Sequence, residues 1–245
     1  MIWEGGLFSL GAGLATGLGA LPVLFTKNAS PKLLDTLLGL SAGIMLGATS
    51  FSLVLPSIQL GDVWVAALGI LLGGAFLALS NRLVPHLHTF SGREGPSLSL
   101  SRVWLFVLAI TIHNFPEGVS VGVGFGRGDL LEGMGLAMGI GFQNIPEGMA
   151  VAFALLREGY SPFRAIGYAT LTGLVEPIGG LIGVTVVTLA QSLLPWGLAF
   201  AGGAMLFVIS NEIIPETHRS GHPLEATSGV LLGFVVMTIF DNLFG

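Results

Sequence analysis

The chain has 245 residues, of which 52% are hydrophobic and 9% are charged, with a formal net charge of −5 and no cysteine. Soluble domains carry about 25% charged residues, so this composition excludes an ordinary water-soluble fold, and no nucleic-acid partner is expected. The lack of cysteine excludes disulfides, thiolate metal sites and cysteine nucleophiles. We therefore predict an all-α integral membrane protein whose main partner is the lipid bilayer.

Eight apolar stretches along the chain are long enough to form membrane-spanning helices. A bilayer core of roughly 30 Å requires about 20 apolar residues per helix. The connections are short, except for a Pro-, Gly- and Ser-rich segment at 81–101 that is expected to be a solvated loop. We predict one transmembrane domain over residues 1–245, with helices at about 5–26, 34–58, 62–83, 102–125, 130–156, 164–190, 196–215 and 224–244.

The basic residues are distributed unequally between the two sides of the predicted bundle. Only Arg127 lies on one side, whereas the other eight Lys and Arg lie on the opposite side. Cytoplasmic loops carry the excess of Lys and Arg, so we expect the eight in the cytoplasm and both termini outside. The eight are Lys27, Lys32, Arg82, Arg93, Arg102, Arg157, Arg164 and Arg219.

Polar residues recur near the middle of three predicted helices. The fourth helix contains HNFPEG at residues 113–118, the fifth contains QNIPEG at residues 143–148, and the sixth contains Glu176 followed by Pro177. Ionisable groups inside membrane helices are costly and mark functional sites by default. The fourth and fifth helices run antiparallel, so the repeated hexapeptide predicts two halves that face each other, as in many transporters.

The spacing inside each hexapeptide predicts a pair of ligands on one helix face. His113 and Glu117 are four residues apart, as are Gln143 and Glu147, which brings their Cβ atoms to about 5–6 Å. The intervening prolines cannot donate a backbone hydrogen bond, so they kink the helices and free a carbonyl oxygen. We expect antiparallel, Pro-kinked helices at the centre of the bundle.

The three buried carboxylates indicate a cation as the substrate. Glu117, Glu147 and Glu176 would be like charges in a low-dielectric region with no Lys or Arg at their depth. A divalent ion would neutralise them, and a set of carboxylate, imidazole and amide groups suits Zn²⁺, Cd²⁺, Fe²⁺ or Mn²⁺. The presence of a single histidine, His113, inside the predicted spans and the lack of thiolates argue against tight structural zinc. We predict a metal-ion carrier with no organic cofactor.

Several other interpretations remain open at this point. The polar residues could form a structural network between helices, or a proton relay without metal. The protein could also be a metal-selective channel, or a proton-coupled transporter of another divalent cation. An intramembrane metalloprotease would require a HExxH helix, which the sequence lacks, so we do not expect an enzyme.

Polar residues outside the centre are candidates for the transport path. Glu212 and Glu216 lie near the predicted cytoplasmic end of the seventh helix, with His218 just beyond them. Asp241 lies near the outer end of the eighth helix, and Ser50 lies on the second. They are expected to guide the ion out of and into the centre, although polar helix ends and packed serines are the alternative explanation.

The paired motifs HNFPEG and QNIPEG, about 30 residues apart and followed by Glu176-Pro177, resemble the ZIP (Zrt/Irt-like) family of metal-ion transporters in its short prokaryotic form. The resemblance covers essentially the whole chain. It implies eight spans, outward-facing termini, location in the plasma (inner) membrane, zinc uptake into the cytoplasm and a homodimer. It further implies that the first, fourth, fifth and sixth helices rock against the rest in alternating access.

The resemblance also implies a binuclear metal centre. The first position would use His113, Glu117, Gln143 and Glu147, with Glu176 able to bridge. The second would use Asn114, Asn144, Glu147 and Glu176. Some family members have aspartate where this chain has Asn144, and the missing charge is expected to weaken the second position or to change the ion that it prefers.

Overall fold

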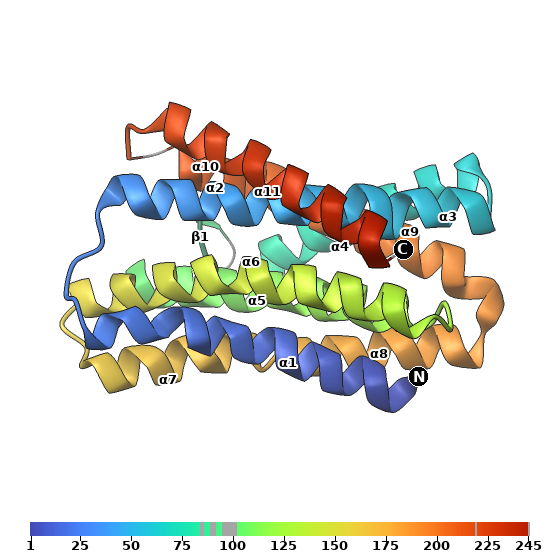
Figure 1. The fold of residues 1–245 in the computed structure, drawn as a ribbon, viewed down its shortest axis with the longest axis horizontal. Helices are drawn as coiled ribbons and strands as arrows, with labels where there is room; N and C mark the ends of the chain where they lie inside the picture. The colour runs from blue at the N-terminus through green and yellow to red at the C-terminus, as the bar shows by residue number, and fades with distance from the viewer. Residues whose placement is uncertain (84–85, 89–91, 95–101, 219, 245) are drawn as a thin grey trace.

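The computed structural model describes every residue except 84–85, 89–91, 95–101, 219 and 245, and it is almost entirely helical (Figure 1). Arg219 and most of the segment predicted as a solvated loop therefore lie outside the described residues. The helices of the first half are α1 (Ile2–Ala20) with the 3₁₀ turn η1 (Leu21–Leu24), α2 (Pro31–Gly47), the π-helical η2 (Ala48–Val54), α3 (Leu55–Leu60) and α4 (Val63–Leu83).

The second half is α5 (Arg102–Phe125), α6 (Leu130–Arg157), α7 (Pro162–Gly173), α8 (Glu176–Leu189), η3 (Gln191–Leu193), α9 (Leu194–Val208), the π-helical η4 (Ile209–Ile213), α10 (Ile214–Thr217) and α11 (Pro223–Phe244). Between the halves, β1 (His86–His88) and β2 (Gly92–Glu94) pair antiparallel, with Leu87 opposite Arg93. This short hairpin falls inside the segment predicted as a loop.

Seven helical stretches in the described part of the chain are long and apolar enough to cross a membrane. The 28-residue α6 is not among them, because Gln143, Asn144 and Glu147 in its middle lower its hydropathy. All three side chains are buried against protein, so they do not face lipid. The predicted class, an all-α membrane protein, is confirmed, and the two termini lie at the same end of the bundle (Figure 1).

The predicted sixth helix is two helices in the structure. It ends at Gly173 and begins again at Glu176, whereas the sequence predicted one helix over about 164–190. Pro177 lacks a backbone donor, so it suits the first turn of a helix and not its interior. Glu176 is consequently the first residue of α8. By contrast, α5 continues through Pro116 and α6 through Pro146.

The turn between α5 and α6 follows from its local sequence. Gly128 has a φ of 87°, a conformation that glycine adopts without steric cost. The next residue, Asp129, caps α6 by accepting hydrogen bonds from the backbone N–H groups of Leu131 and Glu132. This tight connection makes α5 and α6 antiparallel neighbours, so that the two hexapeptides lie side by side.

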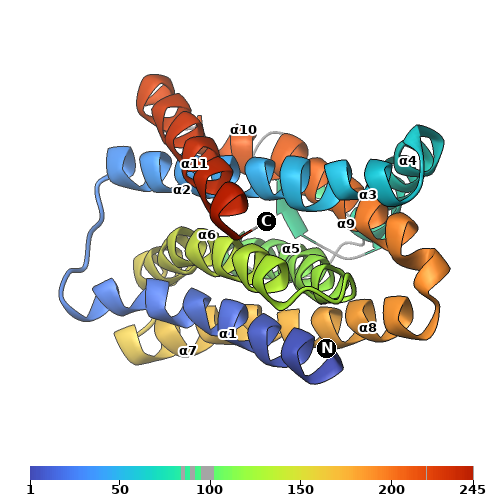
Figure 2. The same cartoon turned by 45° about the vertical axis from the view of Figure 1, so that its right-hand side comes forward.

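The helices form two groups. In Figures 1 and 2, α2, α3, α9, α10 and α11 lie along one side, α1, α7 and α8 lie along the other, and α5 and α6 lie between them. The most extensive packing joins α2 with α11 and α4 with α9, and separately α1 with α6 and α5 with α8. We call the first set, which includes α4 and the π-helical turns η2 and η4, the α2 group, and the second set, α1 with α5 to α8, the α5 group.

Close glycine contacts hold each group together. In the α2 group, a Cβ added at Gly43 would overlap the backbone of α11, and one at Gly73 would overlap α9. In the α5 group, a Cβ at Gly118 would overlap the backbone of Glu176, and one at Gly148 would overlap the backbone of α1. Small residues allow this close approach of helices within membranes.

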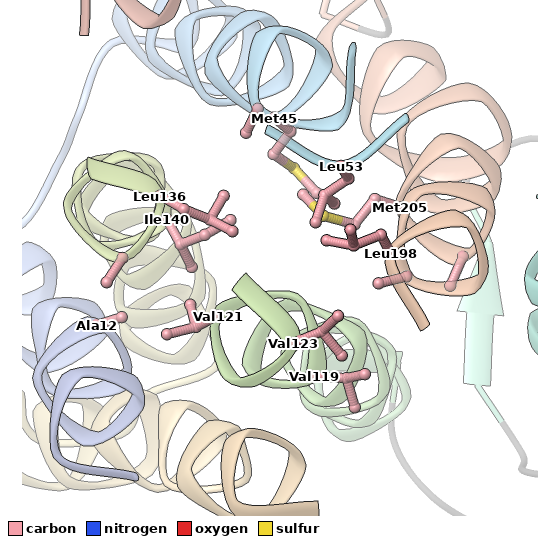
Figure 3. Packing of buried hydrophobic residues seen from close by; sticks show 14 of the residues in the cluster. Ala12, Met45, Leu53, Val119, Val121, Val123, Leu136, Ile140, Leu198 and Met205 are labelled. Atoms are coloured by element: carbon pink, nitrogen blue, oxygen red, sulfur yellow. The ribbon is translucent and has the colours of Figure 1, made fainter. Parts of the chain in front are cut away.

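Apolar side chains form a large part of the packing between the two groups (Figure 3). This apolar layer includes Met45, Leu53, Leu198 and Met205 from the α2 group and Val123, Leu136 and Ile140 from the α5 group. Flexible side chains such as Met adapt to neighbours more readily than backbone contacts do. The interface between the groups is therefore less tightly interlocked than the interior of either group.

Candidate metal centre

The predicted ligands come from three helices of the α5 group and are all buried. α5 supplies the first hexapeptide, α6 supplies the second, and the start of α8 supplies Glu176. Each ligand is at most 3% exposed. The set consists of His113, Asn114, Glu117, Gln143, Asn144, Glu147 and Glu176.

Two amide side chains connect the carboxylates of this centre. Gln143 Nε2 donates to Glu117 Oε2 at 2.5 Å and to Asn144 Oδ1 at 2.7 Å. Asn144 Nδ2 donates to Glu176 Oε1 at 2.7 Å and to the backbone oxygen of Ala12 at 2.9 Å. The network therefore links α1, α5, α6 and α8 at one level of the bundle.

The carboxylates are close but incompletely satisfied. The charges of Glu117, Glu147 and Glu176 interact with one another, and Glu147 also interacts with His113. One oxygen of each carboxylate has no hydrogen-bond partner, and the same holds for His113 Nδ1 and both side-chain polar atoms of Asn114. Buried polar groups are normally paired, so these unpartnered atoms are available for a cation.

The described side chains do not form a closed cage. No three His, Asp or Glu side chains in the described part of the chain are grouped tightly enough to hold an ion. The hydrogen bonds within the centre give the physical reason, since amide N–H groups already occupy one oxygen of Glu117 and one of Glu176. A cation would have to replace these donors and draw the carboxylates together.

Two residues of the α2 group reach into this centre. Ser41 on α2 donates its hydroxyl to Gln143 Oε1 at 2.8 Å and to Glu147 Oε1 at 3.0 Å. Glu212 on η4 contacts Nε2 of His113 and accepts a 2.9 Å hydrogen bond from Asn81. The sequence suggested neither Ser41 nor Asn81, since a serine and an asparagine in apolar helices carry no distinctive pattern.

Two cavities lie on either side of the apolar layer. One of about 50 Å³ is lined by His113, Glu147, Glu212 and Glu216. The other, of about 140 Å³, is lined by Ser52, Arg127, Glu132, Leu136 and Asp241 among others. Along α6, Leu136 and Ile140 separate Glu132 from Gln143, so the apolar layer lies between the larger cavity and the polar centre.

The predicted path residues have different surroundings. Glu212, in the π-helical turn η4 near the end of its span, contacts His113 at the edge of the centre. Glu216 lines the smaller cavity, and Asp241 accepts a 2.7 Å hydrogen bond from Ser52. Ser50 instead bonds the backbone of its own helix at Leu46.

His218 lies outside the lining of both cavities. Its Nδ1 is 2.9 Å from the backbone oxygen of Ile214 and 2.8 Å from the hydroxyl of Thr217, and its Nε2 is 3.3 Å from Thr227. These contacts hold the imidazole at the end of α10.

The fold and the centre define a multi-pass membrane protein with an acidic, amide-rich centre buried between helices. Residues 89–241 match the family model described as ZIP zinc transporter. The chain is 51% identical to the zinc transporter GufA of Myxococcus xanthus, covering 97% of each chain. It is 42% identical to the zinc transporter ZIPB of Bordetella bronchiseptica, over 94% of this chain and 78% of that one.

Similarity extends to an animal protein. The zinc transporter ZIP11 of Homo sapiens is 33% identical over 92% of this chain and 93% of its own length. The chain therefore belongs to the ZIP family of zinc transporters, and the resemblance stated from the motifs is confirmed. Members of this family are transporters and not enzymes.

Proposed function

We propose that this protein carries Zn²⁺ across a membrane and that the ion binds in the buried centre between α5, α6 and α8. The observation that carries the proposal is the set of three neighbouring carboxylates, each with one unpartnered oxygen in the protein interior. Zinc is the ion named for the related proteins of bacteria and animals. Cd²⁺, Fe²⁺ and Mn²⁺ have compatible ligand chemistry and are the alternative substrates.

The proposed ligands fall into two neighbouring positions. The first uses His113, Glu117, Gln143 and Glu147, and Glu176 is able to bridge to it. The second uses Asn114, Asn144, Glu147 and Glu176, and it has one carboxylate fewer than a site with aspartate at position 144. Fewer negative ligands reduce the attraction for a divalent ion, so we assign the higher affinity to the first position.

We infer the orientation of the chain in the membrane from the charge distribution, and uptake into the cytoplasm is the direction that the resemblance to the ZIP family implies. Eight of the nine Lys and Arg lie on one side of the predicted bundle, so we assign that side to the cytoplasm and both termini to the outside of the plasma (inner) membrane. Zn²⁺ would enter by the larger cavity at Asp241 and leave past Glu212 and Glu216. Ser50 and His218 are weaker candidates for the path, because both bond to local backbone.

An alternating-access carrier accounts best for the two groups of helices. Rigid glycine contacts within each group and adaptable apolar side chains between them support movement of one group against the other. A channel is the second candidate, and a homodimer is the expected assembly. Coupling to protons is a further possibility, because a bound cation displaces protons from its ligands.

Uptake of Zn²⁺ into proteoliposomes tests this function directly. We expect saturable uptake by the parent protein, and none by Glu147→Ala or Glu176→Ala, because each of these residues serves both proposed positions. Glu225→Ala is the matched control, since Glu225 pairs with Lys32 at the start of α11. Parental uptake by both site variants would refute the site assignment, and ohmic single-channel currents would refute the carrier.

A further inference from the structure

Ser41 contacts the proposed centre from outside the group of helices that forms it. Its side chain is completely buried on α2, whereas Gln143 and Glu147 belong to α6. One hydroxyl proton is shared between Gln143 Oε1 at 2.8 Å and Glu147 Oε1 at 3.0 Å. This hydroxyl therefore connects the α2 group directly to two proposed ligands.

The orientation of the Gln143 amide is incompatible with a shared cation. Its Nε2 donates to Glu117 Oε2 at 2.5 Å, while its oxygen faces Ser41. An amide binds a metal ion through its oxygen, because the NH₂ group has no lone pair to offer. For Gln143 and Glu117 to bind one ion, the amide must turn its oxygen toward Glu117 and away from Ser41.

We propose that Ser41 is a positioning residue that holds the Gln143 amide in its metal-free orientation and loses this hydrogen bond when the cation binds. The inference rests on the proposed zinc transport and deepens it. Because Ser41 and Gln143 lie in different groups, binding of the ion removes a bond between the two groups. Occupancy of the site is thereby linked to the freedom of the groups to move.

A binding measurement separates this role from a structural one. In Ser41→Ala the amide turns without having to break the hydrogen bond to Ser41, so we expect the Kd for Zn²⁺ of the purified protein to fall about tenfold, the effect of one buried hydrogen bond. Ser41→Thr keeps the hydroxyl and should bind as the parent does. The matched control is Ser9→Ala, since Ser9 is equally buried but bonds the backbone of its own helix at Gly5.

A second measurement follows the movement of the groups. The chain has no cysteine, and Val123 in the apolar layer is buried and lies close to Gly197 of α9, so Val123→Cys introduces a single and nearly isosteric probe between the groups. Without zinc, we expect a cationic, membrane-impermeant thiol reagent to label this cysteine about tenfold faster when Ser41→Ala is added, because a bond between the groups is missing. Ser9→Ala should leave the rate unchanged.

The outcomes are distinguishable from those of the proposed function. A parent protein that binds no Zn²⁺ contradicts the transport proposal itself. A parent that binds zinc, together with a Ser41→Ala variant whose Kd is unchanged or weaker, overturns the role of Ser41 alone. An unchanged labelling rate overturns the link to the movement of the groups, and tighter binding by Ser41→Thr shows that the hydroxyl is not responsible.

Discussion

Asn144 on α6 donates a hydrogen bond of 2.7 Å to Glu176, the first residue of α8. The same amide nitrogen donates to the backbone oxygen of Ala12 at 2.9 Å. Asn144 therefore joins three helices and satisfies one carboxylate oxygen without any ion. An aspartate at this position accepts hydrogen bonds only, so it would lose both contacts and add a fourth acid to the centre.

Asn144→Asp should exchange stability for metal affinity. Without metal, we expect the free energy of unfolding to fall by about 1–3 kcal/mol, because two buried acceptors lose their donor. With zinc, the second equivalent should bind more tightly. Thermal unfolding with and without Zn²⁺ and calorimetric titration measure the two effects, and a metal-free protein as stable as the parent would contradict the role assigned to Asn144.

Gly118 determines how closely α5 approaches Glu176. A Cβ at this position would overlap the backbone of Glu176, so Gly118→Ala should lower the free energy of unfolding by about 1–3 kcal/mol. The overlap should also displace Glu176, a proposed ligand, and thereby reduce zinc uptake. Gly167→Ala is the control, because no atom lies within 4 Å of its added Cβ. In α7 that control should be stabilising by up to about 1 kcal/mol.

His113 is the one imidazole among the seven proposed ligands. Nitrogen ligands favour Zn²⁺ over harder ions such as Mn²⁺, so His113→Ala should reduce zinc uptake at least about tenfold and reduce Mn²⁺ uptake less. His222→Ala is the control, since His222 lies outside the centre and bonds Asp35 at 3.0 Å. Competition between Zn²⁺ and Mn²⁺ for uptake into proteoliposomes measures this selectivity. An equal loss of uptake for both ions would refute a selective role for the imidazole.

Asp241 lines the larger cavity together with Glu132, and the sequence suggested Asp241 as part of an entrance. Its charge should concentrate cations near the path, so Asp241→Asn should raise the KM for Zn²⁺ roughly two- to fivefold at low ionic strength with little change in the maximal rate. Salt should diminish the difference. Asp62→Asn is a control, because Asp62 caps α4 through contacts with Trp64 and Val65, and asparagine also caps helices.

The class of fold was predictable because few sequences can exist in a bilayer. Long apolar stretches separated by short connections require helices, since lipid offers no partner for backbone hydrogen bonds. The ends of α4, α5, α6 and α11 lie within about one residue of the values predicted from hydropathy alone. The family was recognisable from two hexapeptides, because buried Glu, Asn and His are rare at such depth.

The interruption of the predicted sixth helix before Glu176 could not be predicted from the local sequence. Pro177 is tolerated inside a bent helix or at the first turn of a new one, and the sequence does not distinguish the two. In the structure α7 ends and α8 begins at this point, and the backbone of Glu176 packs against Gly118. The close approach of α5 and α8 favours the break.

The sequence by itself determined which residues are too polar for lipid, namely the buried acids and amides of α5, α6 and α8. Only the tertiary structure decided which groups they meet. Ser41, Asn81 and Glu212 lie on other helices, up to 131 residues away from their partners in sequence. Hydropathy records the cost of burying a polar side chain, but the partner that offsets this cost is chosen by how distant helices pack.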